Sequence, residues 1–115
     1  MEILVIVPQE IAHDAVSDPA VKVRGYRTFQ DVLAALGAPA DAVVLLSDLV
    51  PETNRMIIAG AVKQGGRPVI EVRSERWDGE SDSPLSAACR GVISGFGLAG
   101  IEAAVALLRR ERAAG

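Results

Sequence analysis

The fold of this chain is decided by the stretch Asp41-Ala-Val-Val-Leu-Leu-Ser-Asp-Leu-Val-Pro51. Residues 42–46 are all apolar, with no alternation, and Ser47 and Asp48 follow them directly. A strand that is apolar on both faces needs cover on both faces, which predicts a central strand of a parallel sheet with helices on either side. Ligands bind beyond the carboxyl ends of such strands, so Ser47 and Asp48 are expected at the functional edge of the sheet.

Four further strands can be placed around this one. Residues 3–7 form a continuous apolar run that ends at Pro8, which predicts a second buried strand. Residues 21–26 alternate apolar and charged side chains, as expected for an exposed edge strand. Residues 68–72 and 91–94 are the fourth and fifth strands.

Helices are expected at residues 9–17, 28–37, 51–65, 83–90 and 98–112, so strands and helices alternate along the chain. Thr28 and Asp31 have the spacing of a capping box at the start of the second helix. Right-handed crossovers then give an α/β domain with three layers and a doubly wound parallel sheet of five strands. The edge-like second strand indicates the flavodoxin-like strand order 2-1-3-4-5. We expect residues 1–115 to form one domain.

Composition narrows the class of protein. Half of the 115 residues are apolar but only 3% are aromatic, so the core must be aliphatic, as in a parallel sheet. The net charge of −3 predicts no nucleic-acid or membrane partner, and no apolar run approaches the roughly 20 residues that span a bilayer. The single cysteine indicates a reducing, cytoplasmic location. With one histidine and one cysteine, a zinc site is not expected.

Three of these strands resemble those of the CheY-like receiver domains of two-component signalling. Residues 3–7 resemble the first receiver strand, residues 68–72 the fourth, and residues 41–51 the strand that ends in the phosphorylated aspartate. The resemblance covers nearly the whole chain. It implies that the acceptor position is Ser47 or Asp48, and a slip of one residue in register decides between them.

The chemistry of that family needs a magnesium ion held by an acidic pair, together with a hydroxyl and a lysine at neighbouring strand ends. Here the acidic pair falls on Pro8 and Gln9, the lysine near Gly95, and the hydroxyl on Arg73 or Ser74. The resemblance therefore implies a pseudo-receiver that is not an enzyme and holds no metal or cofactor. Such a module binds a protein partner, for example an ATPase or a regulator, or self-associates as a dimer.

The last predicted helix is the interface candidate in this interpretation. Ile101, Val105 and Leu108 lie on its apolar side, and its flank is rich in alanine, which permits close helix packing.

A second motif offers an alternative function. Gly95-Phe-Gly-Leu-Ala-Gly100 matches G-x-G-x-x-G between a predicted strand and a predicted helix, directly after Ser94. Backbone N–H groups around Gly95, Gly97 and Gly100 could hold a phosphate, which would make the chain a binding domain for a small phosphate-bearing ligand. The same glycines also suit a tight turn and a close approach of helix and sheet, so both interpretations stay open.

The remaining polar candidates have simpler interpretations. Asp48 can also cap the helix that follows it. His13 is expected on the surface, and Cys89 as a small buried hydrophobe. Trp77, in the acidic segment 75–82, either folds back onto the core or contacts a partner.

Overall fold

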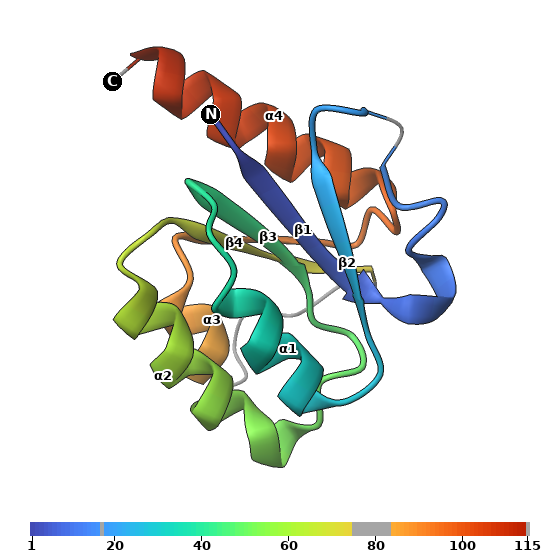
Figure 1. Cartoon of the computed structure of the whole chain (residues 1–115), viewed down its shortest axis with the longest axis vertical. Coiled ribbons are helices and arrows are strands. Elements are labelled where there is room, and N and C mark those ends of the chain that lie inside the picture. The colour runs from blue at the N-terminus through green and yellow to red at the C-terminus, as the bar shows by residue number, and fades with distance from the viewer. Residues whose placement is uncertain (17, 75–83, 115) are drawn as a thin grey trace.

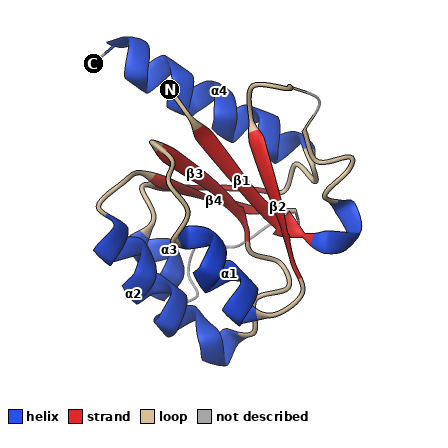
Figure 2. Ribbon diagram, in the orientation of Figure 1, coloured by secondary structure: helices blue, strands red, loops and turns tan. Residues whose placement is uncertain are grey.

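A parallel sheet of five strands forms the centre of the computed structural model, which describes residues 1–16, 18–74 and 84–114 (Figures 1 and 2). The order of the strands is β2-β1-β3-β4-β5, which confirms the predicted flavodoxin-like α/β fold. The strands are β1 (Ile3–Pro8), β2 (Lys22–Tyr26), β3 (Ala42–Leu46), β4 (Val69–Arg73) and β5 (Gly91–Ser94).

Helices cover the two faces of this sheet unequally. The helices α1 (Phe29–Leu36), α2 (Arg55–Gly65) and α3 (Pro84–Ala88) lie on one face, and α4 (Ala99–Ala114) lies on the other (Figure 1). Two short 3-10 helices, η1 (Gln9–Ile11) and η2 (Glu52–Asn54), follow β1 and precede α2. No helix in the described part of the chain is long and apolar enough to cross a membrane.

The strand β3 is central, as its sequence predicts. It pairs with β1 on one side and with β4 on the other, and all five of its residues are buried. Ala42, Val44 and Leu46 pack in the core beneath α4. Val43 and Leu45 pack beneath α1 and α2 on the opposite face. The unbroken apolar run of β3 therefore corresponds to a strand that is buried on both faces of the sheet.

The predicted helix over residues 9–17 is wrong beyond its first turn. The helical hydrogen bonds stop early, since η1 ends at Ile11 and turns follow it. Ile11, Ala12, Ala15 and Val16 nevertheless pack against the core beneath α4. Their apolar spacing thus reflects contact with the core, and tertiary packing satisfies it without a helix. Ser17 lies outside the described residues.

Local signals at helix ends explain two other boundaries. Thr28 Oγ1 accepts a hydrogen bond from Asp31 N at 3.3 Å, and Asp31 Oδ2 accepts one from Thr28 N at 3.2 Å, which confirms the capping box. Gly66 follows α2 with φ of 65°, the left-handed conformation that glycine adopts at little cost.

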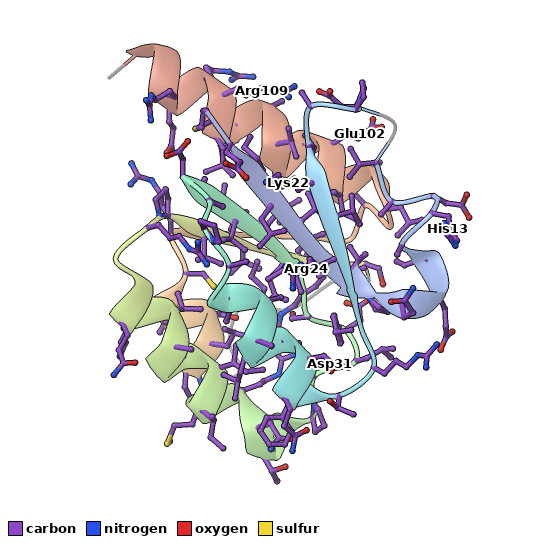
Figure 3. The ribbon with its side chains drawn as sticks, viewed as in Figure 1. His13, Lys22, Arg24, Asp31, Glu102 and Arg109 are labelled. Atoms are coloured by element: carbon purple, nitrogen blue, oxygen red, sulfur yellow. The ribbon has the colours of Figure 1, made fainter. Side chains whose placement is uncertain are left out.

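Several charged side chains lie around the outside of the fold (Figure 3). Lys22 and Arg24 are exposed on the edge strand β2, and His13 is exposed in the turn that follows η1. Arg109 of α4 pairs with Asp18 at 2.7 Å and so ties the helix to the connection between β1 and β2. An exposed ion pair of this kind contributes little to stability.

Gly100 marks the point where α4 lies closest to the sheet, and this contact generates a prediction. A Cβ atom at Gly100 would lie 2.9 Å from Val72 Cγ1 and 3.4 Å from Ile93 Cγ2. We expect Gly100→Ala to lower the free energy of unfolding by about 1–3 kcal/mol, because the overpacked core must shift. The measurement is equilibrium unfolding in urea.

Gly60, on the exposed side of α2, provides the matched control. A Cβ there meets nothing within 4 Å, so Gly60→Ala should raise the free energy of unfolding by about 0.5–1 kcal/mol. If both variants changed stability in the same direction, the close approach of α4 would not explain the need for Gly100.

Candidate functional site

A cavity of about 360 Å³ opens at the carboxyl edge of the sheet. The chain leaves β1 toward β2 and leaves β3 toward β4, so the two connections diverge there, and such switch points are where open α/β sheets bind ligands. We call this cavity the carboxyl-edge pocket. Among the residues that line it are Glu10, Ile11, Asp48, Leu49, Ser74 and Leu98.

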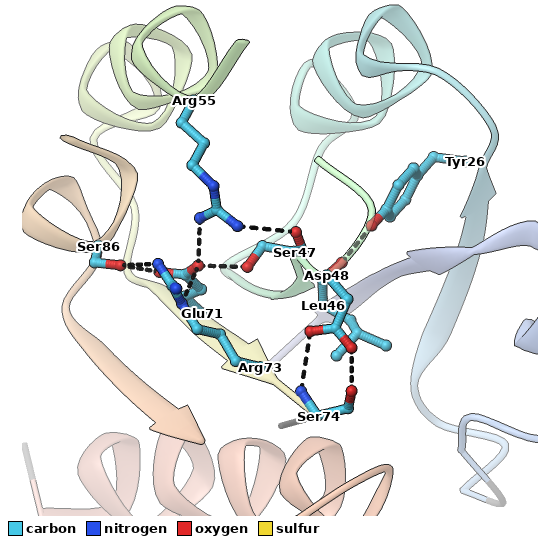
Figure 4. A network of polar contacts seen from close by, with 9 residues as sticks. All are labelled: Tyr26, Leu46, Ser47, Asp48, Arg55, Glu71, Arg73, Ser74 and Ser86. Carbon is cyan, nitrogen blue, oxygen red and sulfur yellow. Dashed lines mark hydrogen bonds and ion pairs between the residues drawn. The ribbon is translucent and has the colours of Figure 1, made fainter. Parts of the chain in front are cut away.

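Asp48 is the residue of the predicted acceptor pair that faces this pocket. Its Oδ1 accepts a hydrogen bond from Ser74 N at 3.0 Å, and its Oδ2 accepts one from the Ser74 hydroxyl (Figure 4). The carboxylate therefore bridges the ends of β3 and β4, and the N-cap residue of α2 is Asn54 and not Asp48. Ser47 is fully buried on the other side of β3, so the structure separates two residues that the sequence left as alternatives.

Ser47 belongs to a buried polar cluster around Glu71, under α2 and α3 (Figure 4). The Glu71 carboxylate is fully buried in the strand β4. It accepts hydrogen bonds from the Ser47 and Ser86 hydroxyls, from Arg55 Nη1 at 3.0 Å and from Arg73 Nε at 3.1 Å. We call these five residues the Glu71 cluster.

The cluster keeps Glu71 ionised although it is buried. Burial by itself raises the pKa of Glu71, but hydrogen bonds from Ser47 and Ser86 and the adjacent guanidinium groups outweigh that effect and hold the pKa below its usual value. Sequence reasoning missed this residue. The signal that marks it is a glutamate inside an otherwise apolar strand, which requires a buried partner from elsewhere in the chain.

Tyr26 fixes the end of β3 from the other side. Its buried hydroxyl donates to the Leu46 carbonyl oxygen at 2.7 Å, and burial raises the pKa of Tyr26 to about 12. Burial, followed by the charge of Glu71, likewise raises the pKa of the half-buried Cys89 thiol to about 12. A thiol with that pKa is not a reactive nucleophile near neutral pH.

The glycine motif does not form a phosphate cradle. The N–H groups of Gly95 and Gly97 donate to the carbonyl oxygens of Arg73 and Ser74 at 3.2 and 2.9 Å, and Gly100 N donates to Gly97 O at 3.3 Å. Those donors are therefore already used within the chain. Gly95 and Gly97 have φ of 85° and 56°, so their role is to shape the turn after Ser94.

The interface candidates on the last helix are part of the core. Ile101, Val105 and Leu108 have exposed fractions of 0%, 5% and 2%, and they pack against β1, β3 and β4. Their periodicity records how α4 covers the sheet, so these three side chains present no surface to a partner.

A second, larger hollow of about 750 Å³ lies at the opposite, amino edge of the sheet. Arg67 occupies this region and donates to the carbonyl oxygens of Leu36, of Ala38 at 2.6 Å and of Ala40 at 3.3 Å. These bonds satisfy carbonyl groups at and beyond the end of α1. Arg67 in this hollow thus caps the end of α1.

Other site predictions are not tested by the fold. No group of three His, Cys, Asp or Glu side chains that could hold a metal ion occurs within the described residues. The acidic segment 75–82, with Trp77, lies outside them. The expected protein partner or homodimer stays a prediction, as does the expectation of no nucleic-acid or membrane partner.

Comparison with known proteins identifies solved structures that share the fold. No protein-family model and no curated protein matches the chain. A type II dehydroquinase from Propionibacterium acnes superposes with a TM-score of 0.68 and 23% identity, covering 93% of this chain and 94% of that one. A type II dehydroquinase from Butyrivibrio crossotus DSM 2876 has a TM-score of 0.63 and 18% identity, covering 95% and 97%. At these identities the likeness establishes the shared fold.

These comparisons overturn the receiver interpretation. The two structures described above are dehydroquinases, which are enzymes, and neither is a receiver domain. The identification as a pseudo-receiver is wrong, and the same finding contradicts the signalling role, the alternative of a phosphate-binding domain and the expectation that the chain is not an enzyme. The physical reason is that apolar strands ending in a polar residue occur in any doubly wound parallel sheet.

The buried charge of Glu71 generates a prediction about stability. Glu71→Gln leaves two arginines beside an uncharged side chain, and we expect the free energy of unfolding to fall by about 3–5 kcal/mol near neutral pH. The advantage of the wild type should be complete above pH 4.5, the ordinary value for glutamate, and lost as the pH falls through the lower folded-state pKa. Urea unfolding between about pH 7 and pH 3 measures it.

Glu102, exposed on α4, supplies the control for this experiment. Glu102→Gln should change stability by no more than about 0.5 kcal/mol at any of these pH values. A stability difference between wild type and Glu71→Gln that stays constant with pH would show that folding does not change the pKa of Glu71, and a difference that shrinks as the pH rises above 4.5 would show that Glu71 is not ionised in the folded protein.

A second prediction concerns the only tyrosine in the chain. The ultraviolet absorbance of tyrosinate should report ionisation of Tyr26 at about pH 12 in the folded protein and at about pH 10 in denaturant. Because the folded-state pKa is raised, the corresponding stability is present below pH 10 and is lost as the pH rises toward 12. A midpoint near pH 10 in the folded protein would contradict the burial of this hydroxyl.

Proposed function

We propose that this chain is an enzyme that acts on a small molecule in the carboxyl-edge pocket, with Asp48 as the group that exchanges a proton with the substrate. The observation that carries the proposal is the Asp48 carboxylate, held by Ser74 at the wall of a cavity that lies at the switch point of the sheet. This is the position at which open α/β sheets bind their ligands.

The structural neighbours support an enzyme over a passive module. Both are named as type II dehydroquinases, and the likeness spans more than nine-tenths of each chain compared. Most of the chain is therefore built on the same plan as an enzyme. Dehydroquinate belongs among the compounds to test, although a shared fold does not carry a substrate with it.

The surroundings of Asp48 suit proton transfer. A carboxylate offers about four lone-pair positions, and Ser74 uses two of them, so two remain for a substrate. Both oxygens are fixed in direction, which general acid–base catalysis requires. Ile11, Leu49 and Leu98 supply apolar surface around the group.

A cytoplasmic location is part of this proposal. The one cysteine in the chain, Cys89, has no partner with which to form an internal disulfide, so a reducing compartment fits its composition.

The proposal predicts a specific loss of activity. A panel of small ring compounds with hydroxyl or amino substituents, including dehydroquinate, is incubated with the protein and followed by NMR. We expect the wild type to consume at least one compound and Asp48→Asn to lower its kcat/KM by about 10²–10⁴-fold, as expected when a positioned proton-transfer group is removed. The exposed Glu102→Gln variant should keep wild-type activity.

Two results would contradict the proposal. The first is that no compound in the panel is consumed by the wild type. The second is that Asp48→Asn, shown to be folded by circular dichroism, turns over the substrate at the wild-type rate.

A further inference from the structure

The apolar wall of the carboxyl-edge pocket comes from several parts of the chain. Ile11 follows β1, Leu46 and Leu49 lie at the end of β3, and Leu98 follows β5. Leu49 and Leu98 remain 58% and 38% exposed. Exposed apolar surface that converges on a cavity with a few polar groups is typical of a ligand site.

The polar side chains of this pocket offer acceptors to a ligand. The Ser74 hydroxyl and backbone N–H both donate to Asp48, and Gly97 N donates to Ser74 O at 2.9 Å. Among the side chains of the described lining, the groups left for a ligand are lone pairs of Asp48, of Ser74 Oγ and of the exposed Glu10 carboxylate. A ligand that pairs with these side chains must therefore bring the donors.

Charge and size restrict the ligand further. Glu10 and Asp48 place two carboxylates on one cavity, and two negative charges attract a cation and repel an anion. Arg73, the nearest arginine in sequence to Ser74, directs its guanidinium group to Glu71 and Ser86 in the Glu71 cluster. The volume of about 360 Å³ is at the small end for ligand pockets, which favours a single ring.

We infer that the carboxyl-edge pocket binds a single-ring compound that presents an ammonium or hydroxyl group to Asp48 and an apolar face to Leu49 and Leu98. The inference names the substrate class of the proposed function and rests on it. It places amines and neutral alcohols ahead of carboxylates and phosphates.

Three probes with the same ring test this inference on the isolated chain: benzylamine, benzyl alcohol and benzoate. Binding is measured from the amide NMR shifts of Ser74, Gly97 and Leu98 during titration. We expect benzylamine to bind with a millimolar Kd and benzoate at least about tenfold more weakly. Benzyl alcohol should fall between the two.

Matched variants separate the charge from the apolar wall. Asp48→Asn should weaken the binding of benzylamine by about tenfold or more, because it removes the charge and keeps the shape of the side chain. It should change the Kd of benzyl alcohol by less than about threefold. Leu98→Asn should weaken both probes alike. Glu10→Gln provides a second test of the charge if Asp48→Asn unfolds, and Glu102→Gln should change neither probe.

The outcomes distinguish this inference from the proposed function. Three results would overturn the inference. They are tighter binding of benzoate than of benzylamine, unchanged selectivity in both Asp48→Asn and Glu10→Gln, and no binding of any probe at about 20 mM. Consumption of dehydroquinate without competition by benzylamine would support an enzyme and also overturn it. Selective binding of benzylamine with no compound consumed would support the inference and count against catalysis.

Discussion

The buried carboxylate of Glu71 holds together the carboxyl half of the domain. Its partners are Ser47, directly after β3, and residues of α2, β4 and α3, so one side chain joins four parts of the fold. A buried charge is costly unless it is fully compensated, and two guanidinium groups and two hydroxyls provide that compensation here. A cluster of this kind fixes geometry more than it adds stability, because each member has only one arrangement that satisfies the others.

That fixed geometry extends to the pocket on the other side of β3. Ser47 donates its hydroxyl to Glu71, accepts from Arg55 Nη2 at 3.2 Å through its carbonyl oxygen, and donates its N–H to Val72 O at 3.1 Å. The next residue, Asp48, is therefore directed to the opposite side, where Ser74 holds its carboxylate. A positioned group supported by a second layer of fixed partners is the usual construction of a functional site.

The resemblance to receiver domains shows that apolar strand sequences predict the fold class but not the protein family. The receiver-like strands correctly indicated a parallel sheet, since burial on both faces requires helices on each side, and the alternating strand at residues 21–26 indicated the strand order. Strand sequences of this kind are common to the whole fold class, so they did not identify the family. The helical stripe of Ile101, Val105 and Leu108 was ambiguous in the same way, because core packing and an interface produce one periodicity.

The sequence by itself determined the sheet, its order and the edge at which Ser47 and Asp48 lie, because apolar patterning and the crossover rule are local or nearly local constraints. Only the tertiary structure decided which of those two residues faces the pocket, which partners surround the buried Glu71 and which carbonyl oxygens the glycine N–H groups bind. The deciding contacts join residues far apart in the chain, 24 positions for Ser47 and Glu71 and 26 for Asp48 and Ser74. Such pairings depend on strand register, and no pattern within either segment specifies them.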